Sequence, residues 1–212
     1  MIDSRLGCST ISFRHLELEK ALDEIITLGF EEVDLGSLPG VCTHVPTTLT
    51  ASDVARIATS VAKAGVSVRI WIESLHVFRL CCNQPRAVGL TSRLDPEVGI
   101  GMDFSHIVAA GDHPVQFVET FGDRITHVHI RDATRGRIEL DHHPIVDEPG
   151  NINLSVGRGA VDFDAGISAL HAAKFDGHYT LELETRDVTD DERPAAAADA
   201  AHLITTLLAS HH

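Results

Sequence analysis

The chain has few cysteines, few basic residues and no long uncharged stretch, and each shortage excludes a class of protein. Its four cysteines, Cys8, Cys42, Cys81 and Cys82, are too few for a disulfide framework and lack CxxC spacing, so we expect reduced structural thiols. Lysine and arginine total 17 against 31 aspartate and glutamate residues, and the net charge of −14 disfavours nucleic acids and anionic membranes as partners. The uncharged stretches are too short to span a bilayer, and the N-terminus has no leader pattern, so we expect a cytoplasmic protein.

The length and apolar content indicate one globular domain. With 212 residues, of which 43% are hydrophobic, the chain can bury a full core. This length exceeds the usual domain of about 150 residues and lies near the lower end of the roughly 200–400 residues of (β/α)₈ barrels. Because no linker or break in composition divides the sequence, we expect a single domain over residues 1–212.

Strand patterns alternate with helix patterns along the chain. A helix over 16–28 ends at Gly29, and a second is expected over 51–64, between Thr50 as its N-cap and Gly65 as its terminator. Six strands are expected to begin at Leu6, Phe30, Val66, Gly99, Ile125 and Tyr179, with further helices over 86–94, 114–121, 163–173 and 193–208. This alternation predicts a parallel sheet with helices outside it.

Four ionisable residues stand where predicted strands end: Glu73, Asp103, His129 and Glu182. The carboxyl ends of parallel strands are where such folds build active sites. Three carboxylates and one imidazole suit Mn²⁺, Mg²⁺, Co²⁺ or Zn²⁺, and a cation would offset the repulsion among the three negative charges. Each residue alone is more often a solvated or salt-bridged side chain. The prediction of one divalent metal ion therefore depends on all four falling at equivalent positions.

Five motifs occur in a fixed order along the chain. They are Trp71-Ile-Glu-Ser-Leu-His76, Asp103-Phe-Ser-His106, His127-Val-His-Ile-Arg-Asp132, Gly157-Arg-Gly-Ala-Val-Asp-Phe163 and Asp176-Gly-His-Tyr-Thr-Leu-Glu-Leu-Glu184. Together they resemble the sugar-phosphate isomerase/epimerase family with a xylose-isomerase-like TIM barrel, which includes inosose dehydratases, hydroxypyruvate isomerases and ketose 3-epimerases. The resemblance is loose over Leu6–Phe30 and closer over Glu73–Glu184.

The resemblance implies a reaction and a set of residues that perform it. Glu73, Asp103, His129 and Glu182 would hold the metal ion, and substrate contacts would come from His106, His76 and Arg135, with Arg131 as the second choice after Arg135. Glu73 and Glu182 would also exchange a proton with the carbon beside a carbonyl. The passage through an enediolate would isomerise or epimerise a sugar or sugar phosphate, and loss of a hydroxyl instead would make the protein a dehydratase.

Several assignments stay open at this level. Glu184 faces the same side of its strand as Glu182, which is preferred because it follows Asp176-Gly177 at the family's spacing. Arg158 could bind a substrate phosphate, or its Gly157-Arg158-Gly159 segment could be a plain turn. His44 could reach the pocket or lie in solvent.

The chain is shorter than usual for this family, and the difference falls near residue 70. Val66–Glu73 begins like the family's third strand and ends like its fifth, so we expect a TIM-barrel-like fold shortened to about six β/α units. Because an open sheet has two unpaired edges, a distorted barrel, a homodimer or another homo-oligomer is expected. Two other functions compete: a non-catalytic barrel descendant with a binding or regulatory role, and an apurinic endonuclease, which the −14 charge disfavours.

Overall fold

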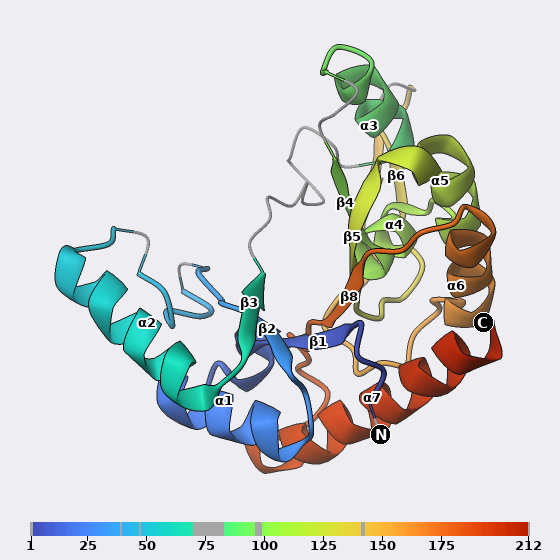
Figure 1. Cartoon of the computed structure of the whole chain (residues 1–212). Coiled ribbons are helices and arrows are strands. Elements are labelled where there is room, and N and C mark those ends of the chain that lie inside the picture. Colours follow the sequence, from blue (N-terminus) through green and yellow to red (C-terminus); the bar gives the residue numbers. More distant parts are fainter. Residues whose placement is uncertain are drawn as a thin grey trace.

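The six expected strands form one parallel sheet in the computed structural model, which describes residues 2–38, 40–46, 48–69, 83–95, 99–140 and 143–211 (Figure 1). The strands are β1 (Leu6–Ser9), β2 (Glu32–Asp34), β3 (Ser67–Arg69), β4 (Ile100–Asp103), β5 (Ile125–Ile130) and β8 (His178–Leu181). Their order is β3-β2-β1-β8-β5-β4, so β3 and β4 are the two ends of the sheet. Within the described residues no ladder joins these ends, and the barrel is not closed.

Helices alternate with the strands and pack along one side of the sheet (Figure 1). They are α1 (Leu18–Thr27), α2 (Ala51–Ala64), α3 (Gln84–Thr91), α4 (Phe104–Ala110), α5 (Pro114–Phe121), α6 (Phe163–Ala172) and α7 (Arg193–Ser210), with short 3₁₀ turns over 10–13, 122–124 and 190–192. In the part of the chain that the structure describes, no helix is both long and apolar enough to cross a bilayer.

Local signals place the ends of α2 at the predicted residues. The Thr50 hydroxyl accepts a hydrogen bond from the backbone of Asp53, whose carboxylate accepts one from the backbone of Thr50, which is a capping box. Gly65 ends the helix with φ = 71°, in the left-handed region that glycine adopts without strain. These contacts involve neighbours in sequence only, which is why the pattern sufficed to locate the helix.

Two features were not predicted. Helix α4 is buried along its whole length, so its sequence lacks the alternation of apolar and polar residues that marks an amphipathic helix. The polar segment after β5 contains a hairpin of β6 (Arg137–Glu139) and β7 (Val146–Glu148), whose exposed strands have little apolar patterning. The pattern over Leu6–Phe13 predicts a longer first strand than β1, which ends at Ser9 because a 3₁₀ turn begins at Thr10.

The two faces of the sheet differ in chemistry. Along each strand every second side chain joins the apolar core under the helices, including Val33, Met102, Val128 and Leu181. The residues between them face the other way and are largely ionisable. The paired residues Asp103 and His129 belong to this second set, so the fold gathers polar side chains on the inner face.

Candidate metal centre

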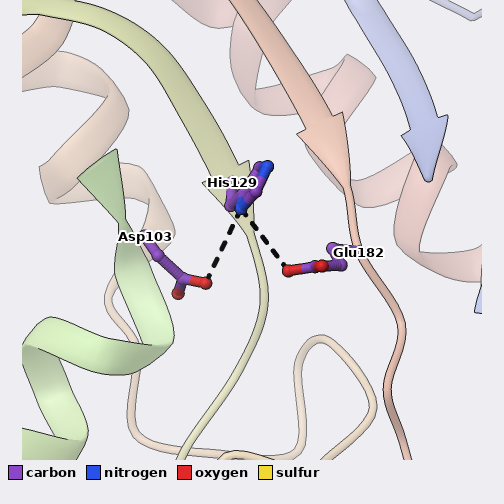
Figure 2. A group of neighbouring side chains, drawn as sticks. All are labelled: Asp103, His129 and Glu182. Atoms are coloured by element: carbon purple, nitrogen blue, oxygen red, sulfur yellow. Dashed lines mark ion pairs between the residues drawn. The ribbon is translucent and has the colours of Figure 1, made fainter. Parts of the chain in front are cut away.

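Three neighbouring strands bring Asp103, His129 and Glu182 together at the carboxyl edge of the sheet (Figure 2). Asp103 is paired in register with His129 across β4 and β5, and Glu182 directly follows β8. One ligand atom from each residue lies within 4.8 Å of the other two, and the side chains are 1%, 5% and 12% exposed. The arrangement offers two carboxylate oxygens and an imidazole nitrogen to one point.

The two oxygens of Asp103 have different surroundings. Oδ1 accepts hydrogen bonds from the backbone and hydroxyl of Ser105, both at 2.7 Å, and from the backbone of His106 at 3.1 Å, which caps α4. Oδ2 is buried and accepts no hydrogen bond from the described residues. A buried carboxylate oxygen without a hydrogen-bond donor is costly unless a cation faces it. Asp103 Oδ2 therefore fits the role of a metal ligand.

Basic groups around Asp103 keep this carboxylate ionised. Burial alone would raise its pKa, but the charges of His106, Arg131 and His129 outweigh burial and hold the pKa well below its ordinary value. The corresponding distances from Oδ2 are 3.6 Å to His106 Nε2, 3.8 Å to Arg131 Nη1 and 3.9 Å to His129 Nδ1. The anionic form is the one that binds a metal ion.

The ring of His129 lies between the cluster and a third carboxylate, that of Asp34. Nδ1 is 3.4 Å from Glu182 Oε2, whereas Nε2 is 3.6 Å from Oδ2 of Asp34, at the end of β2. Histidine ligands of metals are usually oriented by a carboxylate or carbonyl on their other nitrogen. Sequence reasoning missed Asp34, although it ends β2 as Asp103 ends β4.

Arg131 joins the cluster, and Arg135 does not. Arg131 Nη1 donates a hydrogen bond to Glu182 Oε2 at 3.2 Å, and its side chain is 4% exposed. Arg135 is exposed on the surface, where it donates to the carbonyl of Gly111. His129 and Arg131 are two positions apart, so both side chains leave the backbone on the same face. Sequence reasoning preferred Arg135, and the alternation of side chains along the strand is the signal that could have favoured Arg131 instead.

Glu184 lies beside the group formed by Asp103, His129 and Glu182. Its Oε2 accepts a hydrogen bond from Arg131 Nη2 at 2.5 Å. His106 is also close, with Nε2 facing Asp103 Oδ2. Glu73 and His76 lie outside the described residues, as do Cys81 and Cys82, and their assignments stay predictions.

The loop that contains Arg158 is organised around Asp132. The backbone amides of Gly157 and Gly159 both donate to Asp132 Oδ2, at 2.9 and 2.8 Å, so they are already used. The side chain of Arg158 is exposed, and its Nη1 is 3.4 Å from Asp187 Oδ2. The loop therefore has the contacts of a structural turn.

His44 is buried and does not lie in solvent. Its Nε2 is 2.9 Å from the carbonyl oxygen of Leu16, and its Nδ1 is 3.3 Å from Cys42 Sγ. A carbonyl can only accept, so Nε2 donates to Leu16, while the Cys42 thiol lies within reach of both Nδ1 and the carbonyl oxygen of Gly36, at 3.7 Å. Burial raises the pKa of Cys42, and both Cys8 and Cys42 are buried free thiols.

Comparisons with known proteins agree on the fold. The family model described as xylose isomerase-like TIM barrel matches residues 18–207. Inosose dehydratase of Lacticaseibacillus casei is 25% identical over 100 residues, and this match covers 45% of the chain but only 34% of that relative. The structure of L-ribulose 3-epimerase has a TM-score of 0.63 at 14% identity, covering 99% of this chain and 96% of that one. D-psicose 3-epimerase of Clostridium cellulolyticum H10, solved with D-tagatose, gives 0.60 at 12% identity, covering 96% and 99%.

Proposed function

Because the chain belongs to the xylose isomerase-like TIM barrel family, we propose that it is a divalent-metal-dependent isomerase or epimerase of a sugar or sugar phosphate. The observation that carries this proposal is the convergence of Asp103, His129 and Glu182 within 4.8 Å. Two carboxylates and one imidazole suit Mn²⁺, Mg²⁺, Co²⁺ or Zn²⁺. Glu73 would be the fourth ligand, as the resemblance of its motif implies.

The bound ion would polarise a substrate carbonyl and stabilise the negative charge of an enediolate. Glu182 is suited to proton transfer because its carboxylate remains 12% exposed while Oε2 faces His129 Nδ1 and Arg131 Nη1. It removes the proton from the carbon beside the carbonyl. Return of the proton to the former carbonyl carbon, with transfer of the hydroxyl proton between the two substrate oxygens, would give isomerisation. Delivery of a proton to the opposite face of the original carbon by a protonated Glu73 would give epimerisation and leave Glu182 protonated.

Two basic residues complete this mechanism. Arg131 Nη1 is a charged donor at the edge of the cluster, where it stabilises an anionic substrate oxygen. His106 Nε2 is 3.6 Å from Asp103 Oδ2 and would contact the substrate, as the resemblance of its motif implies. A dehydratase is the second candidate, because inosose dehydratase is among the relatives of the chain and the same enediolate can expel a hydroxyl.

The decisive experiment combines metal analysis with proton exchange. Purified protein reconstituted with Mn²⁺ should retain about one equivalent after gel filtration, and it should exchange the proton of a ketose with deuterated water. Glu182→Gln should abolish the exchange, whereas Glu139→Gln, which changes an exposed glutamate of β6, should leave it intact. Less than about a tenth of an equivalent of metal would reject the metal-enzyme proposal and favour a non-catalytic role. Retained exchange in Glu182→Gln would remove Glu182 from the acid/base step.

A further inference from the structure

The guanidinium group of Arg131 lies among three carboxylates, two of which belong to the candidate metal centre. Nη1 is 3.2 Å from Glu182 Oε2 and 3.8 Å from Asp103 Oδ2. Nη2 donates to Glu184 Oε2 at 2.5 Å, the shortest contact between Arg131 and these carboxylates. Because the side chain is 4% exposed, water screens its charge little. The positive charge of Arg131 therefore acts strongly on any ion that binds to Asp103 and Glu182.

The oxygens that face Arg131 are the ones that a metal ion would use. Asp103 Oδ2 and Glu182 Oε2 both lie within 4 Å of Nη1. A positive charge at this distance opposes the binding of a second cation to the same oxygens. Glu184 acts in the opposite direction, because its carboxylate contacts Nη2 and offsets the positive charge of the guanidinium group.

The alternation of side chains along two neighbouring strands explains why four residues lie together. On β5 and the residue that follows it, His129 and Arg131 are two positions apart, and Glu182 and Glu184 are two positions apart after β8. Residues two positions apart in an extended chain share a face. The segment of β5 therefore contributes the ligand His129 and, two residues further on, Arg131. The segment of β8 contributes the ligand Glu182 and, two residues further on, Glu184.

We propose that Arg131 and Glu184 are a positioning pair that sets the cation affinity of the centre, with Glu184 acting through Arg131 and not as a metal ligand. The proposal rests on the proposed function, because it requires the centre to bind a divalent ion. It assigns opposite signs to the two residues. Arg131 weakens metal binding, and Glu184 strengthens it by restraining Arg131.

Four forms of the full-length protein test the pair: wild type, Arg131→Gln, Glu184→Gln and the double variant. Each is stripped of metal and titrated with Mn²⁺ by calorimetry, with far-UV circular dichroism as the check on folding. We expect Arg131→Gln to bind Mn²⁺ about tenfold more tightly and Glu184→Gln about tenfold more weakly. In the double variant the Glu184 effect should disappear, because it requires Arg131. Arg137→Gln and Glu139→Gln, an exposed arginine–glutamate pair 2.8 Å apart, should bind as wild type does.

Other outcomes overturn the inference in distinguishable ways. Unchanged or weaker binding by Arg131→Gln refutes the competition between the guanidinium group and the metal ion. An equal loss from Glu184→Gln in both backgrounds makes Glu184 a ligand. If Arg131→Gln does not fold, Glu184→Gln and the double variant are compared. Binding about 100-fold tighter in the double variant supports the pair, whereas a difference of about tenfold or less refutes it, because independent effects of the two residues give that value. If the folded wild type binds no Mn²⁺ at millimolar concentration, the proposed function itself fails and the inference falls with it.

Discussion

Asp103 and Asp132 lie at the ends of two neighbouring strands: Asp103 is the last residue of β4, and Asp132 comes two residues after β5. Both carboxylates accept hydrogen bonds from backbone amides, but they differ in how many of their oxygens are used. Both oxygens of Asp132 are used: Oδ1 accepts from Ala133 and Val161, and Oδ2 accepts from two glycines of the following loop. Asp103 uses only Oδ1 in this way and turns a buried Oδ2 toward basic side chains. A carboxylate saturated by amides holds a loop in place, whereas one with an oxygen left over can bind a cation.

Packing around the two aspartates supports this difference. A Cβ on Gly159 would overlap Asp132 Oδ1, so the loop can approach the carboxylate only with glycine at that position. Asp103 has the basic groups of His106, His129 and Arg131 around it, which hold its pKa down against the effect of burial. Asp132 is a structural anchor whose oxygens are both used by backbone amides, whereas Asp103 keeps one buried oxygen that faces basic side chains.

Among the effects on metal binding, the largest is expected when Asp103 is changed. Asp103→Asn keeps Oδ1 as the cap of α4 but replaces the anionic Oδ2 with an amide. We expect the Mn²⁺ dissociation constant to rise at least about 100-fold, roughly 2.7 kcal/mol. Calorimetric titration measures it, with Asp132→Asn as the matched control. Binding by Asp103→Asn within fivefold of wild type would show that Oδ2 is not a ligand.

The free energy of unfolding should depend on Asp132, whereas metal affinity should not. In Asp132→Asn, an amide NH₂ replaces one of the oxygens that accept from the loop amides, and the lost charged hydrogen bonds are worth about 1.5–3 kcal/mol each before relaxation. We expect the free energy of unfolding to fall by about 2–4 kcal/mol in urea denaturation, while Mn²⁺ affinity stays within about twofold. A loss below about 0.5 kcal/mol would mean that the loop does not depend on Asp132.

Asp34 should have a smaller influence on metal binding, because it acts through His129. Asp34→Asn removes the carboxylate that faces His129 Nε2 at 3.6 Å, while Nδ1 still faces the cluster. Changes to such partners of histidine ligands typically cost 10–100-fold in metal affinity, and we expect about tenfold, or 1.4 kcal/mol. The same calorimetric titration measures it. An unchanged dissociation constant would exclude Asp34 from orienting the imidazole.

The smallest expected effect is on how steeply the free energy of unfolding falls at low pH. The pKa of Asp103 is lower in the folded chain than in the unfolded chain, so the ionised group stabilises the fold fully above about pH 4, near its unfolded pKa. This contribution is lost as the pH falls through the lower, folded-state pKa. Urea denaturation from pH 5 to pH 2 should therefore show a steeper decline for wild type than for Asp103→Asn. Parallel declines would mean that the basic neighbours do not stabilise the carboxylate.

The sequence identified much of the fold because the relevant signals are local. Thr50 and Gly65 bracket α2 as predicted, and the predicted strand over 125–130 is β5. Helix α4 and the β6–β7 hairpin were missed, since a fully buried helix and an exposed hairpin both lack the periodic pattern that sequence reasoning detects.

The sequence identified the candidate metal ligands of the site but not the residues that surround them. Asp103, His129 and Glu182 could be selected because each stands at a strand end. Arg135 was preferred to Arg131 by analogy, and the structure places Arg131 in the cluster because strand alternation carries it to the same face as His129. Asp34 could not be linked to His129 without the strand order, since β2 and β5 are separated by two strands of the sheet.

The sequence by itself determined the alternation of strands and helices, the six-stranded parallel sheet and the three ligand candidates at its carboxyl edge. These follow from periodicity and chain order, which are local properties. The tertiary structure decided what each carboxylate does. Whether an oxygen of Asp103 or Asp132 is taken by amides or left facing basic groups depends on loops and strands distant in sequence, and hydrogen-bond geometry over such separations exists only in the folded chain.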